Sequence, residues 1–240
     1  MPGATAAVKV GITLPQFRDD ADAALDAARR AEALGFDGVF CFDHLWPMNR
    51  PGRPVLSSGP LLGAVAASTS TTAVGCLVAR VGMVPDQVLV AVMSSLWAIS
   101  DGRLIAGIGT GDHLSRPENL AFGIPFEAAE QRRARLVVVA TAVGAMGIPV
   151  WIGGGHPRTD ELARPVGATV NLWAGEVSRV AELTAAGTEV SWAGPIGATV
   201  PEASARLAGL AAAGATWAVC AWPDSLEATA EAARAARALT

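Results

Sequence analysis

Three histidines, each following a segment that we predict to be a strand, are the side chains best suited to acid–base chemistry. His44 stands directly after Asp43, His113 follows another aspartate, and His156 follows three glycines. A carboxylate beside an imidazole can orient the ring and tune its basicity near neutral pH. The alternative is that Asp43 caps a turn and His44 faces solvent. Because all three histidines fall on one predicted rim, we expect acid–base chemistry there.

The glycine run at 153–155 is followed by His156, Pro157 and Arg158, a pattern that predicts the start of a helix. Such a start presents free backbone N–H groups, and the guanidinium adds positive charge, so the segment suits an anion. Phosphate sites of barrel enzymes also recur late in the chain at a helix start. We therefore favour a phosphate site over the alternative of a plain glycine turn.

The sequence GIGTG at 107–111 has the glycine content of a dinucleotide fingerprint but not its spacing. Asp112 stands where the G-x-G-x-x-G pattern needs its third glycine. We expect these glycines instead to let a flat ring approach the backbone. Trp97 is expected in the core. The tryptophans at predicted strand ends, which are candidates to line an aromatic pocket, are Trp46, Trp173 and Trp222.

Other catalytic motifs are missing from the sequence. It contains no HxH, HExxH or acidic cluster, so we expect no metal site. It also contains no G-x-S-x-G, and no cysteine stands beside a histidine. Cys41, Cys76 and Cys220 lie in apolar runs without CxxC spacing, and we predict that they are buried free thiols.

The composition is that of a folded, strongly apolar protein. Of the 240 residues, 51% are hydrophobic and 17% are charged, which excludes a disordered chain and provides for a large core. The net charge of −4 argues against a general binder of nucleic acid or of anionic membranes. The first residues show no signal-peptide pattern, and proline and glycine interrupt the uncharged runs at 54–79 and 136–157. We therefore expect a cytoplasmic protein.

Short β-branched runs alternate with amphipathic, alanine-rich segments along the whole chain. The runs are continuously apolar, which is typical of parallel strands covered by helices. We predict strands at 8–14, 38–43, 73–80, 104–109, 148–153, 168–173, 189–193 and 216–221. We predict helices at 19–36, 60–70, 85–100, 126–145, 157–166, 176–186, 201–213 and 225–239.

This alternation predicts an α/β protein, a (β/α)8 TIM barrel in a single domain spanning residues 1–240. A doubly wound open sheet is the alternative, but strict alternation without a gap favours closure. Barrels of this kind place their chemistry on the loops after the strands, at the C-terminal face. The strand ends described above are therefore where we expect the site.

Five segments carry a family resemblance: KVGITLPQ at 9–16, AEALGFDGVFCFDHLW at 31–46, GCLVARVGM at 75–83, SDGRLIAGIGTGD with ENLAFGIPF at 100–126, and IPVWIGGGHPR at 148–158. As a set they resemble the bacterial luciferase-like superfamily, and within it the flavin- or coenzyme F420-dependent oxidoreductases. The resemblance covers residues 8–173 in order, and the remainder matches in pattern only.

This resemblance implies a TIM barrel that binds a reduced deazaflavin or FMN at the C-terminal face. It implies that Asp43 and His44 lie beside the cofactor ring, with His44 as the general acid or base. It also implies that a non-proline cis peptide, Leu77-Val78, supports that ring.

The resemblance further implies which glycine-containing segments bind the cofactor. Gly109 and Thr110 are expected to contact it, while Gly154, Gly155 and Arg158 are expected to hold its phosphate. Both segments follow predicted strands, so the two groups of contacts fall on the same face of the barrel.

The sequence departs from the family pattern at two points. Asp112 replaces a glutamate found in many relatives, and its shorter reach bears on the catalytic role expected at this position. Residues 135–148 run directly from a predicted helix into a strand, without the long insertion of relatives between helix 4 and strand 5. Because that insertion usually covers the active site, we expect a pocket that is open or covered by a partner subunit.

These observations predict an oxidoreductase that transfers hydride between coenzyme F420 and a small organic substrate. Two alternatives stay open: an FMN-dependent monooxygenase of the same family, and a degenerate flavin-binding barrel without catalysis. A phosphosugar lyase or isomerase is disfavoured because no strand-borne lysine could form a Schiff base. The expected partner is a small-molecule substrate, with no nucleic acid and no membrane, and an apolar surface on the second and third predicted helices is consistent with a homodimer.

Overall fold

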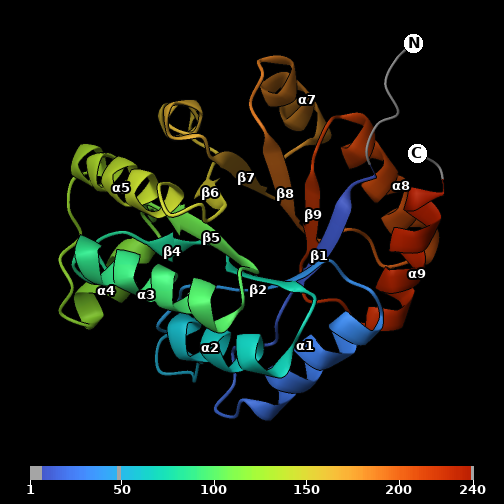
Figure 1. Cartoon of the computed structure of the whole chain (residues 1–240), viewed down its shortest axis with the longest axis horizontal. Helices are drawn as coiled ribbons and strands as arrows, with labels where there is room; N and C mark the ends of the chain where they lie inside the picture. Colours follow the sequence, from blue (N-terminus) through green and yellow to red (C-terminus); the bar gives the residue numbers. More distant parts are fainter. Residues whose placement is uncertain (1–6, 48–49, 239–240) are drawn as a thin grey trace.

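The computed structural model describes residues 7–47 and 50–238, in which parallel strands form a barrel inside a ring of helices (Figure 1). The strands are β1 (Lys9–Thr13), β2 (Gly38–Cys41), β3 (Ala73–Cys76), β4 (Ala79–Arg80), β5 (Leu104–Gly109), β6 (Val150–Gly153), β7 (Thr169–Trp173), β8 (Val190–Gly194) and β9 (Trp217–Cys220). The barrel closes because β1 pairs with both β2 and β9, and β3 pairs with both β2 and β5. The predicted TIM barrel is confirmed.

The third strand of the barrel differs from the predicted continuous strand 73–80. It consists of β3 and β4, separated by Leu77 and Val78, and both parts pair with β5. The peptide bond between Leu77 and Val78 is cis, as the family resemblance implied. The prediction is wrong at these two residues, which belong to neither strand, although the Leu77 N–H still donates to the Cys41 carbonyl at 2.7 Å.

The helices follow the strands around the outside of the barrel. They are α1 (Asp22–Ala33), α2 (Ser58–Ser68), α3 (Asp86–Ile99), α4 (Ser115–Ala121), α5 (Ala129–Gly144), α6 (Pro157–Asp160), α7 (Val177–Ala185), α8 (Val200–Ala212) and α9 (Leu226–Arg237). Helix α4 was not predicted. The predicted helix 157–166 is only the short α6, followed by a 3-10 turn at Arg164–Val166, since Pro165 lacks the N–H that a continuing helix needs. Helix α5 leads into β6 through residues 145–149 alone.

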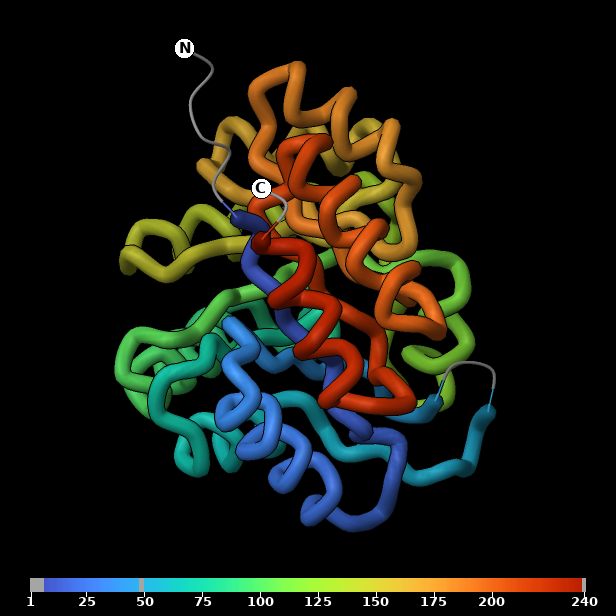
Figure 2. Tube along the Cα trace, turned by 90° about the vertical axis from the view of Figure 1, so that its right-hand side faces the viewer, coloured from blue at the N-terminus to red at the C-terminus, as the bar shows by residue number. Residues whose placement is uncertain are grey.

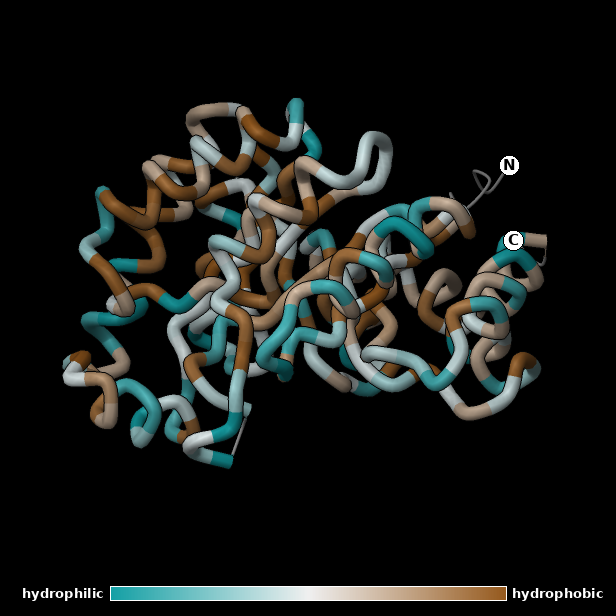
Figure 3. Tube along the Cα trace, turned by 90° about the horizontal axis from the view of Figure 1, so that it is seen from below, coloured by the Kyte–Doolittle hydropathy of each residue, from teal (hydrophilic) through white to brown (hydrophobic). Residues whose placement is uncertain are grey.

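Two layers of apolar side chains stabilise the barrel. Inside it, the Phe40 ring stacks on Trp151 at 5.2 Å between centroids and meets the edge of Trp217 at 5.9 Å. Gly38 and Gly75 leave room for Phe40, because an added Cβ would lie within 2.9 Å of its ring. Outside it, a larger apolar cluster joins strands to helices. Figure 3 shows hydrophobic residues, in brown, along the central strands, with hydrophilic ones, in teal, interspersed along the outer helices.

The predicted buried free thiols are confirmed at Cys41, Cys76 and Cys220. Burial raises the pKa of the Cys220 thiol to about 12. Trp97 packs against the outer apolar cluster, as expected. These side chains therefore belong to the packing of the barrel wall and not to its open end.

The first and last strand–helix units of the barrel lie side by side. Figure 2 shows α9, in red, beside α1, in blue, and the Arg30 side chain of α1 donates a hydrogen bond to Glu227 of α9 at 2.8 Å. Together with the pairing of β1 and β9, this contact joins the first and last strand–helix units. Among the described residues, no helix is both long and apolar enough to cross a membrane.

Candidate active site

The carboxyl ends of the strands surround a cavity of about 780 Å³, a size typical of sites for small molecules. His44, His113 and His156 all line it, so the three histidines share one rim as the sequence predicted. The cavity lies at the end of the barrel where enzymes of this fold place their chemistry.

One wall of the cavity is aromatic. Phe17, which follows β1, stacks on Phe42, which follows β2, with ring centroids 5.8 Å apart. Trp173, at the end of β7, meets the Phe42 ring edge-on at 5.3 Å and is 48% exposed. Exposed aromatic rings at the mouth of a cavity offer a surface on which a flat ligand can pack. Trp173 lines the cavity, as expected. Trp46 instead packs on Phe122, and Trp222 is 42% exposed, and neither lines the cavity.

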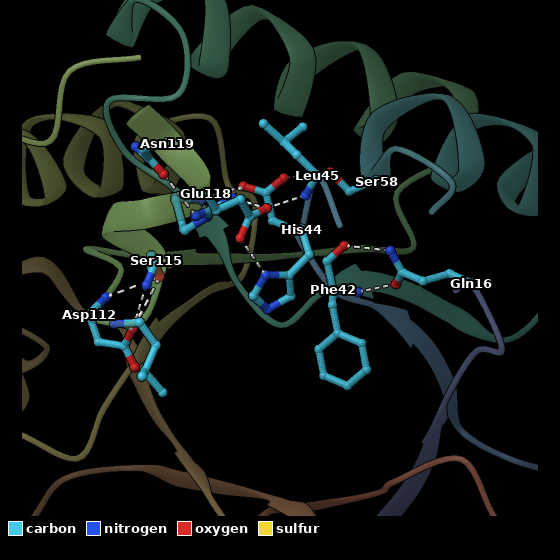
Figure 4. Close-up of polar contacts among 12 residues, drawn as sticks. Gln16, Phe42, His44, Leu45, Ser58, Asp112, Ser115, Glu118 and Asn119 are labelled. Atoms are coloured by element: carbon cyan, nitrogen blue, oxygen red, sulfur yellow. Dashed lines mark hydrogen bonds and ion pairs between the residues drawn. The ribbon is translucent and has the colours of Figure 1, made fainter. Parts of the chain in front are cut away.

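The His44 imidazole is held by a glutamate that the sequence reasoning did not select. Its Nδ1 lies 3.0 Å from Oε2 of Glu118, and Oε1 of Glu118 accepts a hydrogen bond from the Leu45 N–H (Figure 4). Glu118 is carried by α4 and is 2% exposed. The imidazole is therefore oriented by Glu118, and not by its sequence neighbour Asp43 as the pairing of the two residues suggested.

Arg80 links Glu118 to the strand end that carries His44. Its guanidinium donates to Oε1 of Glu118 at 3.0 Å and to Oδ1 of Asn119 at 2.9 Å. Its backbone N–H donates to Oδ2 of Asp43 at 2.8 Å, and Oδ1 of Asp43 accepts from the Ser58 hydroxyl at 3.1 Å. Asp43 thus fixes β4 and α2 against the end of β2, with one buried cation between two carboxylates.

The surroundings of Glu118 favour its ionised form. Burial alone would raise the pKa of this carboxyl, but hydrogen bonds from His44 and from the Leu45 N–H, together with the charge of Arg80, lower the pKa below its ordinary value. An ionised carboxylate can only accept hydrogen bonds, so the proton in the contact with His44 is on Nδ1. The second ring nitrogen, Nε2, is then left to accept or release a proton.

Gln16 fixes the loop that carries Phe42 and His44. Its side chain accepts from the Phe42 N–H and donates to the Phe42 carbonyl at 2.9 Å and the Leu56 carbonyl at 3.1 Å (Figure 4). Gln16 is fully buried. A satisfied buried amide of this kind holds two loops in one arrangement and so positions the aromatic wall.

Most of the predicted site residues do gather at the cavity. Those that line it are Asp43, His44, Leu77, Val78, Gly109, Thr110, Asp112, Gly154 and Gly155. The Asp112 carboxylate, however, accepts from the N–H groups of Leu114 and Ser115 at 2.9 and 3.1 Å, so it forms the turn that begins α4. Arg158 is exposed, and its neighbour Thr159 lines the cavity.

The glycines at 107 and 109 serve the packing of the protein rather than the approach of a ring. A Cβ added to Gly107 would lie 1.9 Å from the Cys76 carbonyl oxygen, and one added to Gly109 would lie 2.2 Å from Val78 Cγ2. The space that we expected a ligand to use is therefore filled by the chain at 76–78, whose Leu77 and Val78 then form the cavity surface.

The backbone N–H groups expected for phosphate are already bonded within the chain. The N–H of Gly154 donates to the Asn171 carbonyl at 2.8 Å, and that of Gly155 donates to Oδ1 of Asp160 at 3.0 Å. The N–H of Arg158 donates to the His156 ring at 3.2 Å. At these three residues the expected N–H donors are therefore not free, because the loop caps its own short helix, and the phosphate site expected there stays a prediction.

Fold and site together define a TIM barrel with a ligand cavity, an aromatic wall and a held histidine. The chain belongs to the luciferase-like monooxygenase family, whose pattern matches residues 4–137, more than half of its length. Two relatives are F420-dependent glucose-6-phosphate dehydrogenases. That of Nakamurella multipartita is 32% identical over 140 residues, and that of Microbacterium testaceum is 31% identical over 134. The matches cover 57% and 54% of this chain, but only 40% and 37% of those proteins.

Solved structures share the fold over nearly the whole chain. An F420-dependent secondary alcohol dehydrogenase in complex with an F420–acetone adduct superposes with a TM-score of 0.80, covering 96% of this chain and 99% of that one, at 13% identity. The coenzyme F420-dependent tetrahydromethanopterin reductase of Methanopyrus kandleri superposes with a TM-score of 0.72 at 15% identity, covering 96% of this chain and 98% of that one. Identities this low establish the barrel fold alone.

Proposed function

We propose that this protein is an oxidoreductase that transfers hydride between coenzyme F420 and a small organic substrate. The observation that carries the proposal is the His44–Glu118 contact at the wall of the cavity, which presents an imidazole nitrogen beside an aromatic surface. The naming of the relatives as F420-dependent dehydrogenases supports the same cofactor. F420, when bound, supplies the ring carbon that donates or accepts the hydride.

The cavity suits the ring portion of such a cofactor. Phe42 and Trp173 offer apolar faces on one side, and Leu77 and Val78, between β3 and β4, form another apolar surface. In this arrangement His44 holds or moves the proton at Nε2, because Nδ1 is bonded to Glu118. Asp43 acts through Arg80 as a positioning residue, and the role we expected for Asp112 stays a prediction.

A second candidate, an FMN-dependent monooxygenase, follows from the family itself. A monooxygenase from Streptomyces bottropensis superposes with a TM-score of 0.70 at 16% identity over 96% of this chain and 98% of that one. The same cavity and the same histidine would serve that chemistry. Residence in the cytoplasm and assembly as a homodimer likewise stay predictions.

Titration of the purified protein separates these functions. F420 and FMN are each added while cofactor fluorescence and absorbance are followed. Binding of F420 with weak or no binding of FMN supports the proposal, and the reverse result supports the monooxygenase. Binding of neither points to a barrel without this chemistry. Reduction of bound F420 is then followed by the loss of absorbance of the oxidised ring, with glucose 6-phosphate and with secondary alcohols as substrates, which tests hydride transfer directly.

A further inference from the structure

A buried carboxylate occupies the loop to which the sequence assigned a phosphate. Asp160, in α6, is 5% exposed. Its Oδ1 accepts from the N–H of Gly155 at 3.0 Å, and its Oδ2 pairs with the guanidinium of Arg179 at 2.9 Å. A backbone N–H and a guanidinium are the donors that an anion would use at such a loop.

The same carboxylate fills the space that a glycine leaves. A Cβ added to Gly154 would lie 2.9 Å from Oδ1 of Asp160 and 2.5 Å from Val170 Cγ1. The side of Gly154 that lacks a side chain is thus packed against Asp160 and Val170. An anionic group could not reach this point without displacing the aspartate.

The charges at the loop are balanced without a ligand. Arg179 offsets the charge of Asp160, and its own pKa is raised, chiefly by the hydrogen bond to Asp160 and then by one to Glu182. The other cationic or titratable side chains of the loop, His156 and Arg158, are exposed to water, where an ion pair contributes little. A dianion placed here would therefore face an additional negative charge with no buried cation to match it.

We propose that Asp160 is a specificity-determining residue that takes the place of a ligand phosphate in the 153–158 loop. The cavity then selects flavin-like cofactors by their ring, and a phosphate at the end of the ribityl side chain adds no affinity at this loop. The inference rests on the proposed function only in assuming that a flavin-like ring enters the cavity.

The matched pair riboflavin and FMN isolates this effect, because the two differ by one phosphate. Dissociation constants are measured by flavin fluorescence for the wild type, for Asp160→Asn and for Asp224→Asn, an exposed control with the same charge change. For the wild type and for the control, we expect the dissociation constants of riboflavin and FMN to agree within about threefold. Asp160→Asn keeps an oxygen for the Gly155 N–H and should shift the ratio toward FMN by about tenfold. Arg179→Gln should shift the ratio in the opposite direction.

Two results would overturn the inference: wild-type protein that binds FMN at least about tenfold more tightly than riboflavin, or an Asp160→Asn ratio equal to that of the control. If neither flavin binds, inorganic phosphate decides instead, with the Gly155 amide resonance as the readout. A phosphate-dependent shift in Asp160→Asn but not in the wild type supports the inference, and a shift in the wild type refutes it. Absence of all flavin and F420 binding would contradict the proposed function without touching this second result.

Discussion

Nδ1 of His44 lies 3.0 Å from Oε2 of Glu118, although the two residues are 74 positions apart in the sequence. Glu118 is buried on α4 and its pKa is lowered: burial would raise it, but the bonds from His44 and Leu45 and the charge of Arg80 outweigh that effect. The contact sets the orientation of the imidazole and leaves Nε2 for chemistry. A histidine on the loop after β2 is thus positioned by an acid on helix α4.

Replacing His44 with asparagine should separate catalysis from cofactor binding. The amide can still donate to Glu118, but it cannot take up or release a proton at the position of Nε2. We expect kcat to fall by about 100-fold or more, while the Kd for the cofactor stays within about twofold. Steady-state kinetics and fluorescence titration measure the two quantities. Unchanged turnover would exclude His44 as the acid or base.

Glu118→Gln should disturb both the stability of the protein and its turnover. The amide removes one of the two carboxylates that neutralise the buried guanidinium of Arg80, so we expect the free energy of unfolding to fall by about 2 kcal/mol. Because the neutral amide can also donate, it no longer fixes the proton on Nδ1 of His44, so kcat should fall by about tenfold or more while the Kd for the cofactor stays within about twofold. The control is Glu182→Gln, whose carboxylate is 64% exposed. A loss of stability with unchanged turnover would show that Glu118 has only a structural role.

The contact between Gly109 and Val78 predicts a coupled pair of substitutions. Gly109→Ala places a Cβ 2.2 Å from Val78 Cγ2 and should destabilise the protein by about 1–3 kcal/mol. In a Val78→Ala background this clash is removed, so most of the loss should be recovered. Gly107→Ala is the control, because its Cβ would meet the Cys76 backbone oxygen at 1.9 Å and the same background cannot relieve it. Denaturant unfolding of the single and double variants gives the coupling energy.

The barrel could be predicted from the sequence because strand and helix periodicity is a local property of the chain. The residues around the cavity could be predicted in part, since the ends of parallel strands necessarily meet at one face. Asp43 and His44 are neighbours in sequence, yet the orienting partner of His44 is Glu118, and no spacing rule connects residues so far apart. Helix α4 carries a weak signal in Asp112, a residue type favoured before helices, whose carboxylate accepts from the N–H of Ser115, the first residue of the helix.

The glycine loop shows a different limit of sequence reasoning. Three glycines before a helix do indicate unpaired N–H groups, but the loop supplies its own acceptor, Asp160, only five residues from Gly155. An aspartate in the first turn of a helix is a common partner for such donors. The sequence therefore contained the signal that a carboxylate bonds to this loop. Arg179, the cation that pairs with this carboxylate, is distant in the sequence and could not be predicted.

Glu32 predicts a defined acid sensitivity of the fold. Its carboxylate accepts from the N–H groups of Ser70, Thr71 and Thr72 and so ties α1 to the turn before β3. Burial would raise its pKa, but these hydrogen bonds and that of the Thr71 hydroxyl lower the pKa from 4.5 to about 2. A pKa lowered by folding stabilises the protein above the unfolded value, and the stabilisation disappears as the pH falls through the folded value.

The expected signature is a pH-dependent difference between the wild type and Glu32→Gln. Because the carboxyl is near solvent, screening reduces the contribution to about 1–2 kcal/mol at neutral pH. The difference in unfolding free energy should be full above about pH 5, shrink between pH 4.5 and 2, and vanish below. Urea unfolding at several pH values measures it, with the exposed Glu161→Gln as the control. A difference that is the same at pH 3 and pH 7 would show that the charge of Glu32 does not hold the turn.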